Sequence, residues 1–167
     1  MYTLEPAKKE DTEKCYEILD MGREFQRKQG FIQWDQRYPT YNMVVEDIEN
    51  GNGYILKTED GKIAAYMYLS FDGDKYYDLK GDIWGSDEPY AVMHRISVHD
   101  DFRGKGITTE VFRLIEELCI QKGIRYIRGD TKKPNERMQH VFLKNGFTFR
   151  GELFYIDDLC LVFDKKI

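Results

Sequence analysis

Arg103-Gly104-Lys105-Gly106-Ile107-Thr108 is a glycine-rich stretch that separates a strand-like run from a helix-like run. The run before it, residues 90–98 (YAVMHRISV), alternates and is rich in apolar residues. In the run after it, apolar residues recur with the spacing of one helical face, at Val111, Leu114, Ile115, Leu118 and Cys119. A glycine turn that opens a helix presents unpaired N–H groups at the positive end of the helix dipole. The stretch is therefore a candidate site for a phosphate-bearing molecule.

The composition of the chain is that of an ordinary globular protein. Of its 167 residues, 41% are hydrophobic and 33% are charged, and we expect one domain over residues 1–167. The 25 basic and 30 acidic residues give a net charge of −5, without the basic excess of many nucleic-acid binders. The first residues do not resemble a signal peptide, and no window approaches the ~20 apolar residues of a membrane span. We therefore expect neither a nucleic-acid partner nor a membrane partner.

The three cysteines are far apart in the sequence, at Cys15, Cys119 and Cys160. No CxxC pair exists, so the sequence indicates neither a disulfide framework nor a metal site. Cys15 and Cys119 fall on apolar helical faces, which favours buried, reduced thiols. A cytoplasmic location is the default expectation.

Glycine, proline and capping residues divide the chain into elements. We predict, in order, a strand at 2–5, a helix from Asp11 or Thr12 to about Gly30, a helix from Thr40 to Gly51, a hairpin of 54–58 and 63–70 around Asp60-Gly61, a polar insert at 71–89, a strand at 90–98, a helix from the glycine turn to about Lys122, a strand at 124–128 ending at Asp130-Thr131, a helix from Pro134 or Asn135 to Asn145-Gly146, and a hairpin of 147–156 and 159–163 around Asp157-Asp158. This order mixes antiparallel hairpins with one helical crossover.

Three nucleotide-binding motifs compete for the glycine stretch. The P-loop pattern G-x-x-x-x-G-K-[ST] is absent, and the G-x-G-x-x-G fingerprint fails because Thr109 takes the place of the last glycine. The third motif, [QR]-x-x-G-x-[GA], binds the pyrophosphate of coenzyme A and is matched at Arg103 and Gly106. Thr108 departs from it, since its Cβ could crowd a phosphate although its hydroxyl could also donate to one. A further alternative is a strand-to-helix turn whose glycines serve the backbone conformation alone.

With the third motif, the chain resembles the GNAT superfamily of N-acetyltransferases, and in particular a bacterial GNAT subgroup, essentially from end to end. The residues that carry this resemblance, besides the glycine stretch, are Gln33-Trp34, Tyr38-Pro39, Asp130-Thr131, Asn135, Met138-Gln139 and Lys144-Asn145-Gly146-Phe147. The resemblance implies an α+β fold with about seven strands in a mixed, mostly antiparallel sheet. This sheet is expected to splay between its fourth and fifth strands and to carry about four flanking helices.

The resemblance also implies acetyl-CoA as co-substrate, without a metal. Its pantetheine arm would pair with the backbone of Ile96 and Val98 like an added strand. An N–H near 95–97 would stabilise the oxyanion that forms during acyl transfer. The implied cofactor-binding residues are Ile96, Ser97, Val98, Arg103, Gly104, Lys105, Gly106, Ile107, Thr108, Asn135 and Phe142. For Asn135, a role as helix N-cap is the alternative.

The implied reaction is direct attack of a neutral amine on the acetyl thioester in a ternary complex. His94 is the candidate base, because an unperturbed histidine titrates near ~6.5, although a histidine on an apolar face is more often a satisfied core residue. Asp130 and Glu88 are the fallback bases. Phe142 stands where many family members place a tyrosine that protonates the thiolate. Another group must then serve, or the thiolate leaves unaided, which a thiol pKa near ~8.5 permits.

The resemblance also implies that the acceptor binds between the early helices and the fourth and fifth strands. This would put Gln33, Trp34, Tyr38, Trp84 and Tyr90 near the amine, and aromatic faces suit an ammonium group. The same aromatics can instead seal the core. The acceptor would be a small molecule or a peptide, and the resemblance leaves a homodimer open.

Three functions follow from these patterns. The first is an acetyl-CoA-dependent N-acetyltransferase. The second is a catalytically silent acyl-CoA-binding or sensor domain, which Phe142 and Thr108 make conceivable. The third is an unrelated nucleotide-phosphate binder that uses the glycine turn alone.

Overall fold

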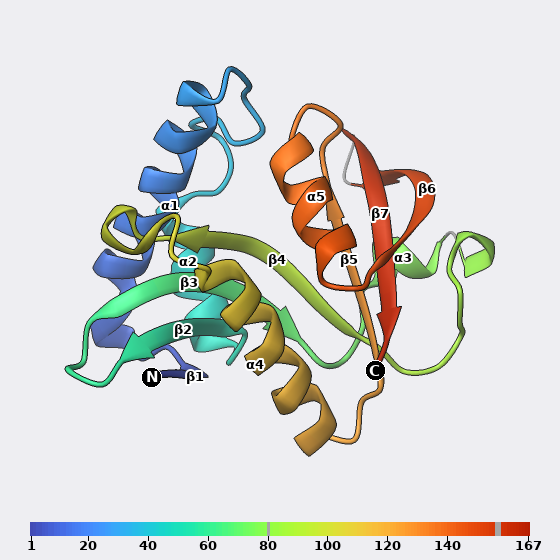
Figure 1. Ribbon diagram of the computed structural model, residues 1–167, viewed down its shortest axis with the longest axis horizontal. Coiled ribbons are helices and arrows are strands. Elements are labelled where there is room, and N and C mark those ends of the chain that lie inside the picture. The colour runs from blue at the N-terminus through green and yellow to red at the C-terminus, as the bar shows by residue number, and fades with distance from the viewer. Residues whose placement is uncertain (80, 156–157) are drawn as a thin grey trace. The chain divides into compact units, whose positions relative to one another are not determined.

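The computed structural model describes residues 1–79, 81–155 and 158–167. Its helices and strands are β1 (Tyr2–Pro6), α1 (Thr12–Lys28), α2 (Tyr41–Glu49), β2 (Gly53–Thr58), β3 (Ile63–Ser70), α3 (Lys75–Asp78), β4 (Ala91–Val98), α4 (Ile107–Gln121), β5 (Tyr126–Thr131), α5 (Glu136–Lys144), β6 (Thr148–Tyr155) and β7 (Asp158–Lys166), with short 3₁₀ turns η1 (Lys9–Asp11), η2 (Gly81–Ile83) and η3 (Asp100–Phe102) (Figure 1). The strands form a seven-stranded sheet in the order β1-β2-β3-β4-β5-β7-β6. The predicted α+β fold with a mixed sheet is confirmed.

The chain forms two compact units. The first comprises Met1–Leu69 and Arg95–Leu114, and the second comprises Ser70–His94 and Ile115–Ile167. Strand β4 contributes its residues 91–94 to the second unit and 95–98 to the first.

In the first unit, the predicted hairpin is confirmed. β1 pairs antiparallel with β2, with Leu4 opposite Leu56, and β2 pairs antiparallel with β3, with Ile55 opposite Tyr66. Gly61 takes the positive φ of 87° that the connecting turn requires.

The helices of the first unit begin where the sequence predicts. Asp11 takes the N-cap position of α1 without a side-chain capping bond, whereas the Thr40 hydroxyl accepts the N–H of Met43 at 3.2 Å at the start of α2. Their apolar faces close on the first unit's core, which contains Ala7, Cys15, Ile18, Leu19, Trp34, Val44, Ile55 and Tyr66. Each fully buried leucine or isoleucine of this set contributes about 1.5–3 kcal/mol.

In the second unit, β4 pairs in parallel with β5 over three register positions, from Ala91 opposite Ile127 to Met93 opposite Gly129. β7 pairs antiparallel with both β5 and β6. The predicted final hairpin is therefore present, although Ile156 and Asp157 of its connection lie outside the described residues. Helix α5 lies beside β5 and β7 (Figure 1).

Two local differences from the prediction have clear causes. The insert at 71–89 contains helix α3, because the Asp74 carboxylate accepts the Tyr76 N–H at 2.9 Å and caps one helical turn. Strand β5 begins at Tyr126 rather than at 124. The N–H of Ile124 instead bonds to Cys119 O at 2.9 Å, and with Gly123 at φ 77° it closes the end of α4.

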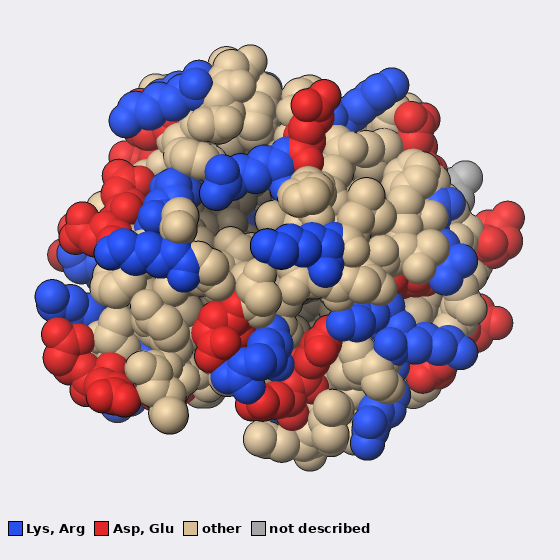
Figure 2. Space-filling model, viewed as in Figure 1, with Lys and Arg blue, Asp and Glu red and all other residues tan. Residues whose placement is uncertain are grey.

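All three cysteines are free and buried, which confirms the predicted burial of Cys15 and Cys119. Burial is the main cause that raises the pKa of Cys15 and of Cys119 to about 12. Within the described residues, no helix combines the length and apolar character that a bilayer crossing needs. On the face drawn in Figure 2, basic and acidic side chains are interspersed.

Candidate functional site

The glycine turn has the geometry that the motif requires. Gly104 and Gly106 have φ of 80° and 72°, a region that other residues rarely adopt. A Cβ added to either glycine would meet nothing within 4 Å, so open space adjoins both. The Glu110 N–H bonds to Gly106 O at 3.2 Å, and the N–H groups of 107–109 precede this first helical bond. The turn thus offers N–H groups at the start of the 15-residue helix α4.

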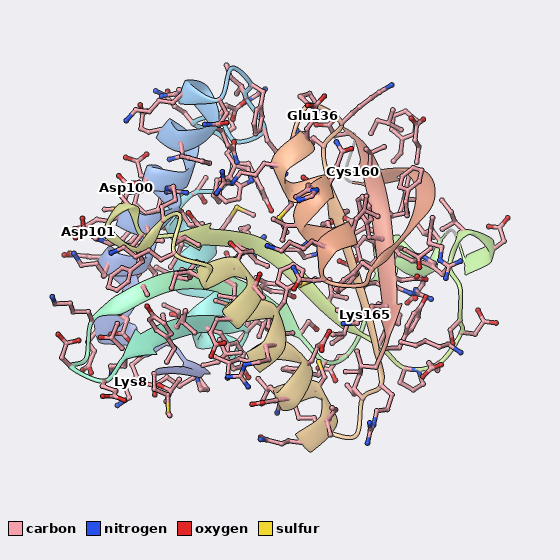
Figure 3. The ribbon with its side chains drawn as sticks, in the orientation of Figure 1. Lys8, Asp100, Asp101, Glu136, Cys160 and Lys165 are labelled. Carbon is pink, nitrogen blue, oxygen red and sulfur yellow. The ribbon has the colours of Figure 1, made fainter. Side chains whose placement is uncertain are left out.

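The two basic side chains of the turn are held by their own loop. Arg103 Nη2 donates to Val98 O at 2.8 Å and to Asp100 Oδ1 at 2.9 Å, and its guanidinium lies 4.0 Å from the Phe25 ring centroid. Lys105 Nζ donates to the backbone carbonyl of the neighbouring 3₁₀ turn at 3.0 Å. Asp100 and Asp101 mark this turn in Figure 3. An incoming phosphate would therefore compete with a carboxylate for Arg103.

Further along the turn, Ile107 is buried and Thr108 is partly exposed. The Thr108 side chain thus lies at the surface of the turn, where the motif has glycine or alanine. Its fit beside a phosphate stays a prediction.

Side chains anchor the segment of β4 that precedes the glycine turn. The Ser97 hydroxyl donates to Ile18 O of α1 at 2.7 Å, and Val98 is buried. Ile96 is partly exposed. Arg95 has φ 53°, the only positive value for a non-glycine residue in the part of the chain that the structure describes. The expected pairing of this segment with pantetheine stays a prediction.

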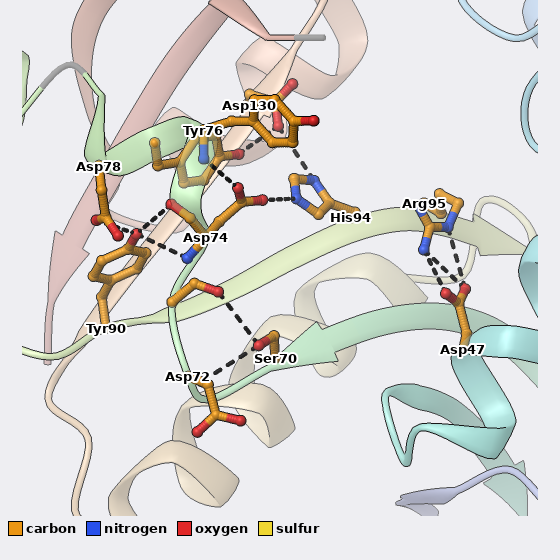
Figure 4. Close-up of polar contacts among 12 residues, drawn as sticks. Asp47, Ser70, Asp72, Asp74, Tyr76, Asp78, Tyr90, His94, Arg95 and Asp130 are labelled. Carbon is orange, nitrogen blue, oxygen red and sulfur yellow. Dashed lines mark hydrogen bonds and ion pairs between the residues drawn. The ribbon is translucent and has the colours of Figure 1, made fainter.

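His94, in the second unit, lies between two carboxylates (Figure 4). Its Nε2 is 3.2 Å from Asp74 Oδ2, and its Nδ1 is 3.3 Å from Asp130 Oδ1. The Tyr77 hydroxyl also donates to Asp130. Both imidazole nitrogens donate only in the protonated ring, which matches two carboxylate partners. A base role for His94 therefore requires the neutral ring, with one of these contacts exchanged.

The two fallback bases lie in different surroundings. Burial alone would raise the pKa of Asp130, but hydrogen bonds and charge from His94, together with Tyr77, lower it overall. Glu88 lies 3.4 Å from Lys166 Nζ and accepts from Ser86 Oγ at 2.7 Å; mainly this serine bond lowers its pKa. Both carboxyl groups are thus stabilised in the ionised form.

Asn135 and Phe142 have structural roles at the two ends of α5. Asn135 Oδ1 accepts the Met138 N–H at 3.1 Å, so the predicted N-cap is present. Phe142 is 1% exposed and stacks on Phe163 with the ring centroids 4.6 Å apart. A cofactor contact by either residue stays a prediction.

Of the predicted acceptor residues in the first unit, Trp34 is buried, whereas Gln33 and Tyr38 are partly exposed. Trp34 is 6% exposed and belongs to the core. The backbone N–H groups of Gln33 and Trp34 both donate to Gln26 Oε1, at 3.3 and 2.9 Å. The Tyr38 hydroxyl accepts from Arg95 Nη1 at 3.0 Å.

The predicted acceptor residues of the second unit share one core cluster. Trp84 donates its indole N–H to Tyr77 O at 3.0 Å. The Tyr90 hydroxyl lies 2.7 Å from Asp78 Oδ1, and burial is the main cause that raises its pKa to about 12. The Arg128 guanidinium lies 4.4 Å and 3.9 Å from the rings of Trp84 and Tyr90. Both aromatic faces already contact a cation, and an acceptor role stays a prediction.

Two polar partners escaped the sequence analysis. Asp74 lies in the insert, 20 positions before His94, and its only sequence signal is an aspartate at a helix start. Asp47 pairs with Arg95 from 48 positions away and carries no local signal.

The sequence matches the Acetyltransferase (GNAT) family over residues 12–147. No curated protein matches it.

Solved structures share the fold at low sequence identity. An acetyltransferase of the GNAT family from Streptococcus agalactiae 2603 is 24% identical, with a TM-score of 0.86 over 99% of this chain and 95% of that one. One from Listeria monocytogenes 4b F2365 is 21% identical, with a TM-score of 0.78 over 99% and 95%. AAC(6')-Ib, solved in complex with ribostamycin and coenzyme A, is 19% identical, with a TM-score of 0.75 over 99% and 93%.

Proposed function

Because the chain belongs to the acetyltransferase (GNAT) family, we propose that it transfers an acetyl group from acetyl-CoA to a primary amine. The observation that carries this proposal is the glycine turn, where two positive-φ glycines lie next to open space at the start of α4. Such a turn suits a pyrophosphate, because backbone N–H groups and the helix dipole both stabilise negative charge.

The residues that would hold acetyl-CoA are those predicted from the sequence, Ile96, Ser97, Val98, Arg103, Gly104, Lys105, Gly106, Ile107, Thr108, Asn135 and Phe142. When bound, acetyl-CoA supplies a thioester carbonyl that a neutral amine can attack. The backbone of 96–98 would position the pantetheine arm and donate an N–H to the developing oxyanion.

Proton transfer would fall to the second unit. The neutral imidazole ring of His94 would accept a proton from the amine. Asp130 would orient this ring through its contact with Nδ1. Phe142 carries no proton for the departing thiolate, so we propose that the thiolate leaves unaided and is protonated from solvent.

The acceptor is a small molecule or a peptide amine. A small molecule is supported by the fold relative AAC(6')-Ib, whose structure contains ribostamycin. In this proposal, Gln33, Trp34, Tyr38, Trp84 and Tyr90 shape the acceptor site. The protein would act in the cytoplasm, in keeping with its three free cysteines.

A catalytically silent acyl-CoA-binding domain is the second candidate. It is favoured by the contacts of His94, whose two nitrogens both face carboxylates, and by the apolar stack around Phe142. Calorimetric titration with acetyl-CoA followed by a thiol-release assay with a panel of amines separates the two. Binding with turnover supports the enzyme, and binding without turnover supports the silent domain.

A charge-reversal pair tests the glycine turn directly. Gly106→Glu places a carboxylate at the proposed pyrophosphate site and is expected to weaken acetyl-CoA binding by at least about 100-fold, or about 2.7 kcal/mol. Gly51→Glu is the matched control, because Gly51 also has a positive φ, 75°, and open space, at the end of α2. Equal acetyl-CoA affinity of the two variants would contradict the phosphate-loop assignment.

A further inference from the structure

The backbone of strand β4 has a left-handed conformation at Arg95. This residue has φ 53°, whereas every other positive φ in the described part of the chain belongs to a glycine. A long side chain is disfavoured in this conformation, so the surrounding contacts must hold it there.

Those contacts come from a buried ion pair with α2 (Figure 4). Arg95 Nη2 lies 2.7 and 2.9 Å from the two carboxylate oxygens of Asp47, and the two side chains are 9% and 8% exposed. The Tyr66 hydroxyl donates to the same carboxylate at 2.7 Å. A planar guanidinium that faces both oxygens fixes direction as well as distance.

Aromatic rings complete the surroundings of the guanidinium. Its central carbon lies 4.8 Å from the Tyr68 ring centroid and 5.7 Å from that of Tyr38. The Arg95 side chain is thus enclosed by α2, β3 and the segment that contains Tyr38. A side chain held on all these sides can fix the backbone that carries it.

Hydrogen bonds hold the segment that follows Arg95 at successive positions. Ser97 Oγ bonds to Ile18 O at 2.7 Å, the His99 N–H bonds to Ala64 O at 2.8 Å, and Val98 O accepts from Arg103 at 2.8 Å. Arg95 therefore lies at the start of a hydrogen-bonded segment that ends in the glycine turn.

We propose that Arg95 is a positioning residue for cofactor binding. Its pair with Asp47 holds the left-handed conformation of Arg95 in β4. That conformation sets the direction of the backbone of 96–98 and, through the Val98–Arg103 bond, of the glycine turn. The affinity for acetyl-CoA then depends on an ion pair outside the predicted cofactor-binding residues. This inference rests on the proposed function.

Two double variants test the proposal. Both carry Asp47→Asn, which avoids leaving an unpaired buried charge. Arg95→Met/Asp47→Asn removes the pair but keeps a side chain that resists positive φ, so we expect acetyl-CoA binding to weaken at least about 10-fold. Arg95→Gly/Asp47→Asn also removes the pair, but glycine adopts positive φ freely. We expect its dissociation constant to return to within about 3-fold of wild type.

The contrast between the two variants is the decisive readout of the calorimetric titration. A merely structural pair would lower the melting temperature of both variants and affect their acetyl-CoA affinity equally. Equal affinity of the Met and Gly variants, whether wild-type or weakened, overturns the proposal.

Arg23→Gln is the matched control for general destabilisation. Arg23 is a buried arginine of the same unit, 4% exposed, which pairs with Asp20 at 2.7 Å and donates to Pro39 O at 2.6 Å. We expect a lower melting temperature with unchanged acetyl-CoA affinity. Weakened binding in this variant, to the extent seen for the Met variant, would also overturn the proposal.

Hydrogen exchange gives a readout that needs no ligand. Without acetyl-CoA, the amides of 96–98 and of 104–109 should exchange faster in the Met variant than in wild type, and unchanged exchange rates overturn the proposal. If the wild-type protein binds no acetyl-CoA, the proposed function fails. The exchange rates still decide whether the pair holds the segment.

Discussion

His94 and Asp130 form a nearly buried contact, with Nδ1 of the imidazole 3.3 Å from Oδ1 of the carboxylate and side-chain exposures of 10% and 11%. An isolated carboxylate at this depth would favour its neutral form. The neighbouring histidine and tyrosine reverse that preference and lower the pKa of Asp130. The contact therefore links the stability of the second unit to pH.

Asp130→Asn should remove part of the acid sensitivity of the protein. The pKa of Asp130 is lowered on folding from its ordinary value of 3.8. Its ionised form therefore stabilises the folded state at pH values above 3.8, and this contribution is lost as the pH falls below 3.8 toward the lowered pKa. We expect the wild-type urea midpoint to fall more steeply between about pH 5 and pH 3 than that of the variant. Asp87→Asn, at an exposed carboxyl of the same unit, is the control with little effect. Parallel curves for wild type and Asp130→Asn would refute the linkage.

His94→Gln tests the proposed base. Glutamine keeps hydrogen-bonding capacity in this position but cannot accept a proton near neutral pH. We expect kcat/KM for the amine to fall by about 100-fold and to lose its dependence on an acidic group, measured by thiol release from pH 5.5 to 9. A pH–rate profile that keeps the wild-type shape would remove His94 from this role.

Asn135 can be tested for two roles separately. Asn135→Ala removes the cap of α5 and should lower the free energy of unfolding by about 1 kcal/mol. Asn135→Asp keeps an oxygen that accepts the Met138 N–H, so stability should stay near that of wild type. If Asn135 also contacts the cofactor, the added negative charge should weaken acetyl-CoA binding by about 10-fold. Unchanged affinity in the Asp variant would leave Asn135 as a cap only.

Gly129→Ala should destabilise the second unit. A Cβ at this position would lie 2.9 Å from Cζ of Phe142, whose ring is held between Phe163 and Phe147 at centroid distances of 4.6 and 5.2 Å. We expect a loss of about 1–3 kcal/mol in urea unfolding. Gly81→Ala is the control, because a Cβ there meets nothing within 4 Å. Equal stability of the two variants would show that the Phe142 stack yields easily.

Much of the fold follows from local rules that act within a few residues. Thr40 and Asn135 begin helices because each side chain accepts an N–H three positions ahead. Gly61 and Gly106 mark turns because only glycine adopts positive φ without penalty. The start of β5 could not be placed in the same way, because Ile124 bonds back to the end of α4.

The candidate site was predictable to the extent that it consists of backbone. The glycine turn and its place before a helix are recognisable from residue types alone, since the N–H groups of a helix start are independent of the side chains. The surroundings of His94 were not predictable, because Asp74 and Asp130 lie 20 and 36 positions from it in opposite directions. No local pattern specifies which carboxylates meet an imidazole.

Chain-local chemistry thus dictates the helix starts, the turns and the phosphate-type loop of this protein. Long-range packing dictates the charge state and orientation of the side chains around them. The left-handed conformation of Arg95 in β4 illustrates this division. An arginine disfavours a positive φ, and the buried carboxylate of Asp47, 48 positions away, reverses that preference. A preference set by one residue's sterics is overcome when a paired charge is buried against it.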